Sequence, residues 1–142
     1  GYKDTSSSDA VYMLDWYAYG IGKVPAKVAT TYQNISDAWS LLIDQKWHDR
    51  ITAIKVSDGG LSYVEFFEYR KNKMSIPLFN IYCATGSNRE YYAERTDLIQ
   101  LGQTTQAIYF AKLTNEGEQS ELALTGDEIK ARFSLVNQAW NN

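Results

Sequence analysis

The chain of 142 residues contains one histidine, His48, and one cysteine, Cys83, and these shortages exclude most metal chemistry. A zinc site needs several His or Cys ligands, and neither C-x-x-C nor H-E-x-x-H occurs. One cysteine also permits no disulfide within the chain. Because Cys83 lies in an apolar run, we expect a buried, unreactive thiol.

Long hydrophobic runs and an excess of positive charge are also lacking. No stretch of about 18 apolar residues occurs, so no transmembrane helix is predicted. The formal net charge is −3, which argues against a nucleic-acid binder, because such proteins cluster Lys and Arg against phosphates. The densest basic run, residues 70–73, is explained equally well by a solvated turn and by a partner. No signal peptide begins the chain, and Gly1 fits a cleavage scar from a longer precursor.

Four Trp and eleven Tyr are present instead, within a hydrophobic content of 44%. This composition predicts an ordinary packed core. Residues 1–30 are interpreted as a polar tail followed by a possible strand at 11–21, which would end a preceding domain. Residues 31–142 are predicted to form a single α+β domain.

The middle of the chain predicts paired strands. Residues 51–57 and 61–69 flank Asp58-Gly59-Gly60, a strong hairpin signal, because glycine adopts positive φ without steric cost. Residues 74–84 are expected to pair back, and apolar groups on both faces of this hairpin indicate cover on each side of the sheet. Pro77 lacks an N–H and should therefore lie at an edge, a bulge or the strand start.

Residues 36–47 fit two structures. Ser36 could cap a helix, and Trp39, Ile43 and Trp47 fall near helical spacing. The alternation of Trp39, Leu41 and Ile43 fits a strand, which we favour because of the resemblance described below.

The last element is predicted as an amphipathic helix packed on the sheet. Thr125-Gly126-Asp127-Glu128 matches a capping box, in which Thr125 accepts from a backbone amide and Glu128 reaches back. One apolar stripe follows at helical spacing. It comprises Ile129, Phe133, Val136 and Trp140.

Catalytic constellations are weak. His48 precedes Asp49, but adjacent residues are not expected to face each other, so an orienting pair is not predicted. Residues 4–9 resemble an oxygen-ligand loop for Ca²⁺ that lacks its glycine, and a polar linker is favoured. The carboxylate pair Glu65 and Glu68 should point to opposite faces of a strand, and Glu90 and Glu94 on a short helix at 88–95 suit a solvated face.

Aromatic and arginine side chains are the best candidates for binding. Two clusters stand out, and exposed rings near arginine can stack on sugars, bases or partner side chains. The alternative is that these rings pack on the core with their hydroxyls in solvent. The candidate residues are Tyr17, Tyr19, Arg89, Tyr91, Tyr92 and Arg95.

The run Trp39-Ser-Leu-Leu-Ile-Asp-Gln-Lys-Trp47-His-Asp-Arg resembles a phrase found in small secreted or lipid-anchored domains of Gram-positive bacteria. These domains have a PsbP/Mog1-like fold. The likeness continues through 63–66, 77–82 and 107–110 to the helix carrying Phe133. It implies an α+β fold with an antiparallel sheet flanked by helices, an extracytoplasmic location and no catalytic residues.

Three functions follow as hypotheses. The first is a non-catalytic extracytoplasmic domain, without cofactor, that binds a protein partner or a cell-envelope component. The second is a carboxylate-dependent glycan-active enzyme, which would need a cleft with two acids, one of raised pKa. The third is a cytoplasmic adaptor of the Mog1 type that acts on a GTPase.

Overall fold

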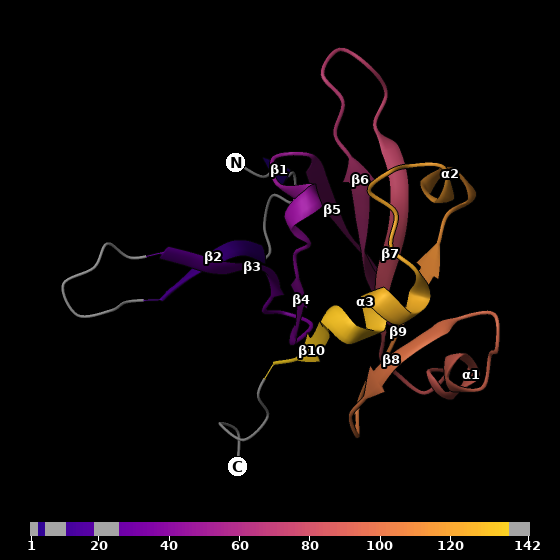
Figure 1. The fold of residues 1–142 in the computed structure, drawn as a ribbon. Coiled ribbons are helices and arrows are strands. Elements are labelled where there is room, and N and C mark those ends of the chain that lie inside the picture. The colour runs from indigo at the N-terminus through magenta and orange to yellow at the C-terminus, as the bar shows by residue number, and fades with distance from the viewer. Residues whose placement is uncertain (1–2, 5–10, 19–25, 137–142) are drawn as a thin grey trace.

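The computed structural model describes residues 3–4, 11–18 and 26–136, which form two β-sheets and short helices (Figure 1). The six-stranded sheet has the order β1-β5-β6-β7-β9-β8, and the four-stranded sheet has the order β10-β4-β3-β2. Neighbouring strands in the described residues are antiparallel except for the pair β1–β5. The predicted class, α+β with an antiparallel sheet and helices, is confirmed.

The bounds of the elements are as follows. The six-stranded sheet contains β1 (Lys3–Asp4), β5 (Ile51–Asp58), β6 (Leu61–Glu68), β7 (Ile76–Ala84), β8 (Ile99–Gln103) and β9 (Ile108–Leu113). The four-stranded sheet contains β2 (Val11–Ala18), β3 (Ala26–Asn34), β4 (Trp39–Leu42) and β10 (Phe133–Leu135). The helices are the 3₁₀ turn η1 (Gln45–Trp47) and α1 (Glu90–Ala93), α2 (Asn115–Glu118) and α3 (Gly126–Arg132).

The central hairpins follow the predicted pattern. β5 and β6 pair across the turn in which Gly59 has a φ of 61°. β6 then pairs with β7, and the register shifts between Phe66 and Phe67. Phe67 lies opposite Pro77, the second residue of β7. Pro77 therefore lies beside a bulge near the strand start, where its missing N–H costs no regular ladder bond.

Residues 36–47 do not form the single helix that Ser36 would cap. Trp39–Leu42 forms strand β4, as favoured. The chain then turns into η1, where the Asp44 carboxylate accepts a hydrogen bond from the Lys46 amide at 3.0 Å. η1 places Trp47 in the core, where its Nε1 donates to the Leu122 carbonyl at 2.7 Å.

The predicted boundary between residues 30 and 31 falls inside β3, Ala26–Asn34. The predicted strand at 11–21 is present as β2, which pairs with β3. β3 in turn pairs with β4, and the Ile43 amide donates to the Thr30 carbonyl at 2.8 Å. The strand at the end of the first predicted unit is thus bonded directly to the second.

The C-terminal helix packs on the sheet, as predicted, but it is shorter. Its capping box is formed, since Thr125 Oγ1 accepts from the Glu128 amide and Glu128 accepts from the Thr125 amide. The expectation that the helix continues through Phe133 and Val136 is wrong, because α3 ends at Arg132 and Phe133–Leu135 forms β10. β10 pairs with the edge of β4 and still buries Phe133. Trp140 lies outside the described residues.

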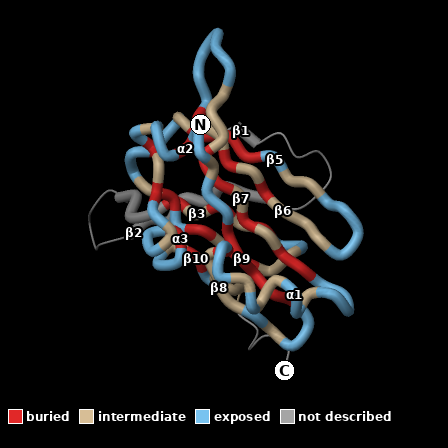
Figure 2. Tube along the Cα trace, turned by 90° about the vertical axis from the view of Figure 1, so that its right-hand side faces the viewer, coloured by how far each residue is buried: buried red, intermediate tan, exposed pale blue. Residues whose placement is uncertain are grey.

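The main core lies between the two sheets and is aromatic. Phe66 packs against Tyr32 and Phe79, with ring centroids 5.1 and 4.9 Å apart. Figure 2 shows that buried residues are concentrated along the middle of the six-stranded sheet. In β9 four consecutive residues, 108–111, are buried, so both faces of this strand are covered. The cover on the outer face includes α1, which contacts β9.

Candidate functional site

The predicted binding residues separate into two groups. Arg89, Tyr91, Tyr92 and Arg95 lie together on α1 and its flanks. Tyr17 belongs to β2, and Tyr19 lies outside the described residues. β2 and α1 are on opposite sides of the molecule (Figure 1). The two predicted clusters therefore do not form one site.

Arg89 positions α1 by contacts within the chain. After β7 the backbone turns at Gly86, whose φ is 87°. The Arg89 guanidinium donates through Nη1 to the Gly86 carbonyl at 2.6 Å and through Nη2 to the Thr105 carbonyl at 3.0 Å. The second bond ties α1 to the turn between β8 and β9. This side chain thus has a positioning role that its sequence pattern did not indicate.

A row of aromatic rings in contact supports α1, and we call Tyr63, Tyr82, Phe110 and Tyr92 the aromatic row. Tyr63 lies opposite Tyr82, and Tyr82 lies opposite Phe110, in the antiparallel ladders. Such directly opposed pairs bring side chains into contact on one face of a sheet. Their centroids are 4.9 and 4.8 Å apart, and Tyr92 stacks on Phe110 at 5.0 Å.

An exposed ring, that of Tyr91, adjoins the Tyr92 end of the aromatic row. The Tyr91 side chain is 64% exposed and meets Tyr92 edge to face at 5.3 Å. The Arg95 guanidinium carbon lies 5.4 Å from the centre of the Tyr91 ring, within range for a cation–π contact. An open hollow of about 550 Å³ adjoins this ring. It is lined by Ser87, Asn88, Glu90, Tyr91 and Tyr92.

The charged groups beside this ring are held in place. Arg95 Nε donates to Asp97 Oδ1 at 2.9 Å, and a second bond joins the same two side chains. The hydrogen bonds from Arg95 lower the pKa of the Asp97 carboxyl, so Asp97 stays ionised. Gln100 Nε2 donates to the Tyr92 carbonyl at 2.8 Å and fixes the end of α1. The surface therefore presents an aromatic ring and a cation in a defined arrangement.

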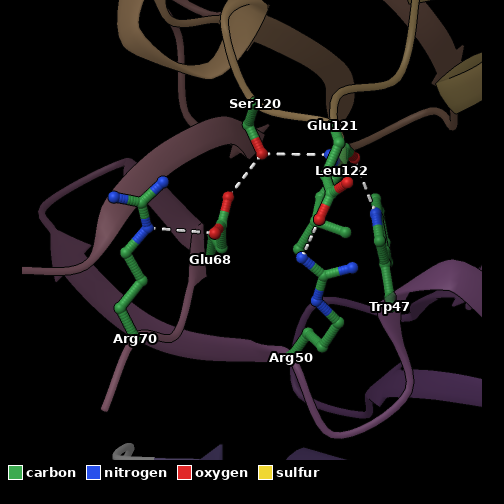
Figure 3. Close-up of polar contacts among 7 residues, drawn as sticks. All are labelled: Trp47, Arg50, Glu68, Arg70, Ser120, Glu121 and Leu122. Atoms are coloured by element: carbon green, nitrogen blue, oxygen red, sulfur yellow. Dashed lines mark hydrogen bonds and ion pairs between the residues drawn. The ribbon is translucent and has the colours of Figure 1, made fainter.

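A second polar cluster surrounds Glu68 (Figure 3). Glu68 is only 6% exposed, and its carboxylate accepts from Ser120 Oγ at 2.5 Å and from Arg70 Nε at 3.0 Å. Burial alone would raise the pKa of Glu68, but the bonds from Ser120 and Arg70 outweigh it and the pKa is lowered. Glu65 lies on the opposite face of β6, as predicted from alternation. Glu68 is therefore an ionised anchor between two loops.

The pKa shift of Glu68 predicts a pH-dependent contribution to stability. A carboxyl whose pKa is lower when folded stabilises the protein above its unfolded pKa, near 4.5, and loses that contribution as pH falls through the folded pKa. Glu68→Gln should therefore lower the free energy of unfolding at pH 7 by about 1–2 kcal/mol. Urea denaturation should show this difference shrinking below pH 4.5. Glu65→Gln is the control, and a Glu68 effect independent of pH would contradict the assignment.

His48 and Cys83 can be placed as well. The expectation that His48 and Asp49 do not face each other is wrong, since His48 Nε2 lies 3.2 Å from Asp49 Oδ2. Asp49 has a φ of 57°, which bends the chain and brings its carboxylate back to the ring. Both side chains are exposed.

Cys83 is buried, and burial raises the pKa of its thiol to about 11, as expected for an unreactive cysteine.

Within residues 3–4, 11–18 and 26–136 no three His, Cys, Asp or Glu side chains gather as a metal-binding group. No helix in the same ranges is long and apolar enough to span a membrane.

Comparison of the chain with known proteins gave no relatives. No family model, curated protein or solved structure matches it. The resemblance to PsbP/Mog1-like domains therefore stays a prediction.

Proposed function

We propose that this chain is a non-catalytic binding domain that holds a protein partner or a cell-envelope component against α1. The observation that carries the proposal is the exposed Tyr91 ring, packed beside Arg95 and supported by the aromatic row. Tyrosine and arginine are enriched among residues that dominate binding energy. A ring already held by its neighbours also loses little conformational freedom on binding.

The lowered pKa of the buried Glu68 favours a binding function over general-acid catalysis by this residue. A glycosidase-type general acid needs a raised pKa. Glu68, the carboxylate that the described structure buries, has a lowered pKa and two hydrogen-bond donors. The extracytoplasmic location and the absence of catalysis are parts of this proposal.

Substituting Tyr91 tests binding with less effect on folding than substituting Tyr92 does. Tyr92 stacks on Phe110, so its removal would open a gap on the outer face of the sheet. Tyr91 is mostly exposed, and truncating it should change the free energy of unfolding by less than about 0.5 kcal/mol. Tyr91→Ala is therefore the informative variant.

Tyr91→Ala should weaken ligand-dependent stabilisation. We would titrate peptidoglycan fragments and oligosaccharides into the parent protein and record its melting temperature. A true ligand at about 100 times its dissociation constant adds roughly 2.7 kcal/mol, a shift of several degrees. Tyr91→Ala should reduce that shift, because the truncation of such an anchor costs about 2 kcal/mol of binding.

The control is Ile35→Ala, which removes an exposed apolar side chain from another part of the chain. Equal shifts in the parent and Tyr91→Ala would refute the assignment of the site. If soluble glycans give no shift, the same variants should be compared for retention on an immobilised cell-envelope protein fraction. Equal retention of parent and Tyr91→Ala would then reject the surface altogether.

A further inference from the structure

The loop between β6 and β7 projects from the end of the six-stranded sheet, away from α1 (Figures 1 and 2). We call residues 69–75 the basic loop; its sequence is Tyr-Arg-Lys-Asn-Lys-Met-Ser. It contains three cations and no acid, whereas the whole chain has a net charge of −3. Three of the fourteen Lys and Arg side chains thus lie close together on a protrusion of an otherwise acidic protein.

The tip of the basic loop combines cations with an apolar side chain. Lys71 and Lys73 are exposed, and Met74 beside them is 90% exposed, more than any other large hydrophobic side chain in the described residues. Exposing Met74 forgoes the free energy that its burial would provide, about 1.5–3 kcal/mol. A solvated turn needs no such side chain. Its place next to two lysines favours a partner whose surface is both anionic and apolar.

The base of the loop is fixed to the body of the protein. The Tyr69 amide donates to the Arg50 carbonyl at 2.7 Å, and Arg70 pairs with the buried Glu68. Glu68 is held in turn by Ser120 (Figure 3). At the tip Asn72 has a φ of 58°, and the Lys73 amide approaches the Arg70 carbonyl at 3.4 Å. The loop therefore presents its lysines and Met74 from an anchored support.

We propose that the basic loop docks the protein on an anionic lipid membrane. Lys71 and Lys73 contact the headgroups, and Met74 enters the boundary between headgroups and acyl chains. A soluble polyanion would pair with the lysine ammonium groups but would leave Met74 in water. A bilayer has apolar acyl chains directly beneath its charged headgroups. Because α1 lies at the other end of the sheet, a docked protein keeps its proposed binding surface free.

The test measures partitioning onto lipid vesicles by co-sedimentation. Neutral vesicles contain phosphatidylcholine alone, and anionic vesicles contain phosphatidylcholine with phosphatidylglycerol. Each basic residue near an anionic surface contributes about fivefold to the partition coefficient. Lys71→Gln/Lys73→Gln should therefore weaken binding to anionic vesicles by about 30-fold. Met74→Ser should weaken it by about tenfold, because burial of that side chain is lost.

The matched control is Lys112→Gln/Lys130→Gln, which makes the same change in net charge at exposed lysines of β9 and α3. This variant should keep binding within about threefold of the parent. Equal losses in the two double variants would overturn the proposal, because binding would then follow net charge. Binding to soluble polyglutamate as strong as to anionic vesicles, with no effect of Met74→Ser, would also overturn it. Melting temperatures confirm that every variant is folded.

Discussion

Replacing Trp47 with alanine should lower the free energy of unfolding by about 3–5 kcal/mol, the usual range for a fully buried tryptophan. Trp47 has no exposed surface and packs on Phe79, with ring centroids 5.6 Å apart. Its Nε1 also binds the Leu122 carbonyl, which joins η1 to the segment between α2 and α3 (Figure 3). The variant loses packing, creates a cavity and leaves the buried Leu122 carbonyl without its hydrogen-bond donor.

Urea denaturation of parent and variant measures this change, provided that the slope m is unaltered. Trp47→Phe separates the two contributions, because it keeps a ring and removes the donor. It should cost about 1–3 kcal/mol, the penalty for leaving the Leu122 carbonyl unsatisfied. A loss below about 1 kcal/mol for Trp47→Ala would mean that this side chain does not hold η1 against the core.

Local patterns predicted the elements whose stability is local. The Asp58-Gly59-Gly60 turn fixed one hairpin, because glycine supplies the positive φ that this turn requires. The capping box set the start of α3, since its two hydrogen bonds connect residues three apart. In both cases the interaction that determines the structure lies within the predicted segment.

The end of α3 depends on a distant partner and was missed for that reason. Phe133 follows Ile129 by four residues, a spacing that fits a helix, yet Phe133 pairs with Leu41 in the ladder between β10 and β4. Strand pairing occupies the edge of β4 and buries Phe133 against Trp39, with ring centroids 5.8 Å apart. Tertiary pairing therefore overrides a helical pattern that continues to Val136.

The candidate site was predicted only in part. The exposed end, Tyr91 and Arg95, was identified because rings and arginines cluster in the sequence. Tyr63, Tyr82 and Phe110 were not identified, because Tyr63 lies opposite Tyr82 only through the register shift between Phe66 and Phe67, which no local pattern indicated. The role of Arg89 depends on the Thr105 carbonyl, and that of Glu68 on Ser120, which no local pattern connects.

Replacing Gly117 with alanine should lower the free energy of unfolding by about 2–3 kcal/mol, although alanine is the better helix former. A Cβ at this position would lie 2.5 Å from the Leu78 carbonyl oxygen and 2.8 Å from the Leu78 Cα. Both atoms belong to the backbone of β7 at the bulge opposite Phe66 and Phe67, and the Leu78 carbonyl already accepts from the Thr114 amide at 3.2 Å. The Cβ would also lie 2.6 Å from Thr114 Oγ1, the cap of α2.

Gly102→Ala is the matched control, since a Cβ there meets only side-chain atoms of β10, the nearest at 3.8 Å, an ordinary contact distance. It should change the free energy of unfolding by less than about 0.5 kcal/mol in the same urea titration. Helix propensity alone would make Gly117→Ala more stable by about 1 kcal/mol. The sign of the measured change therefore decides whether α2 lies directly on the backbone of β7, and a stabilised Gly117→Ala variant would refute that contact.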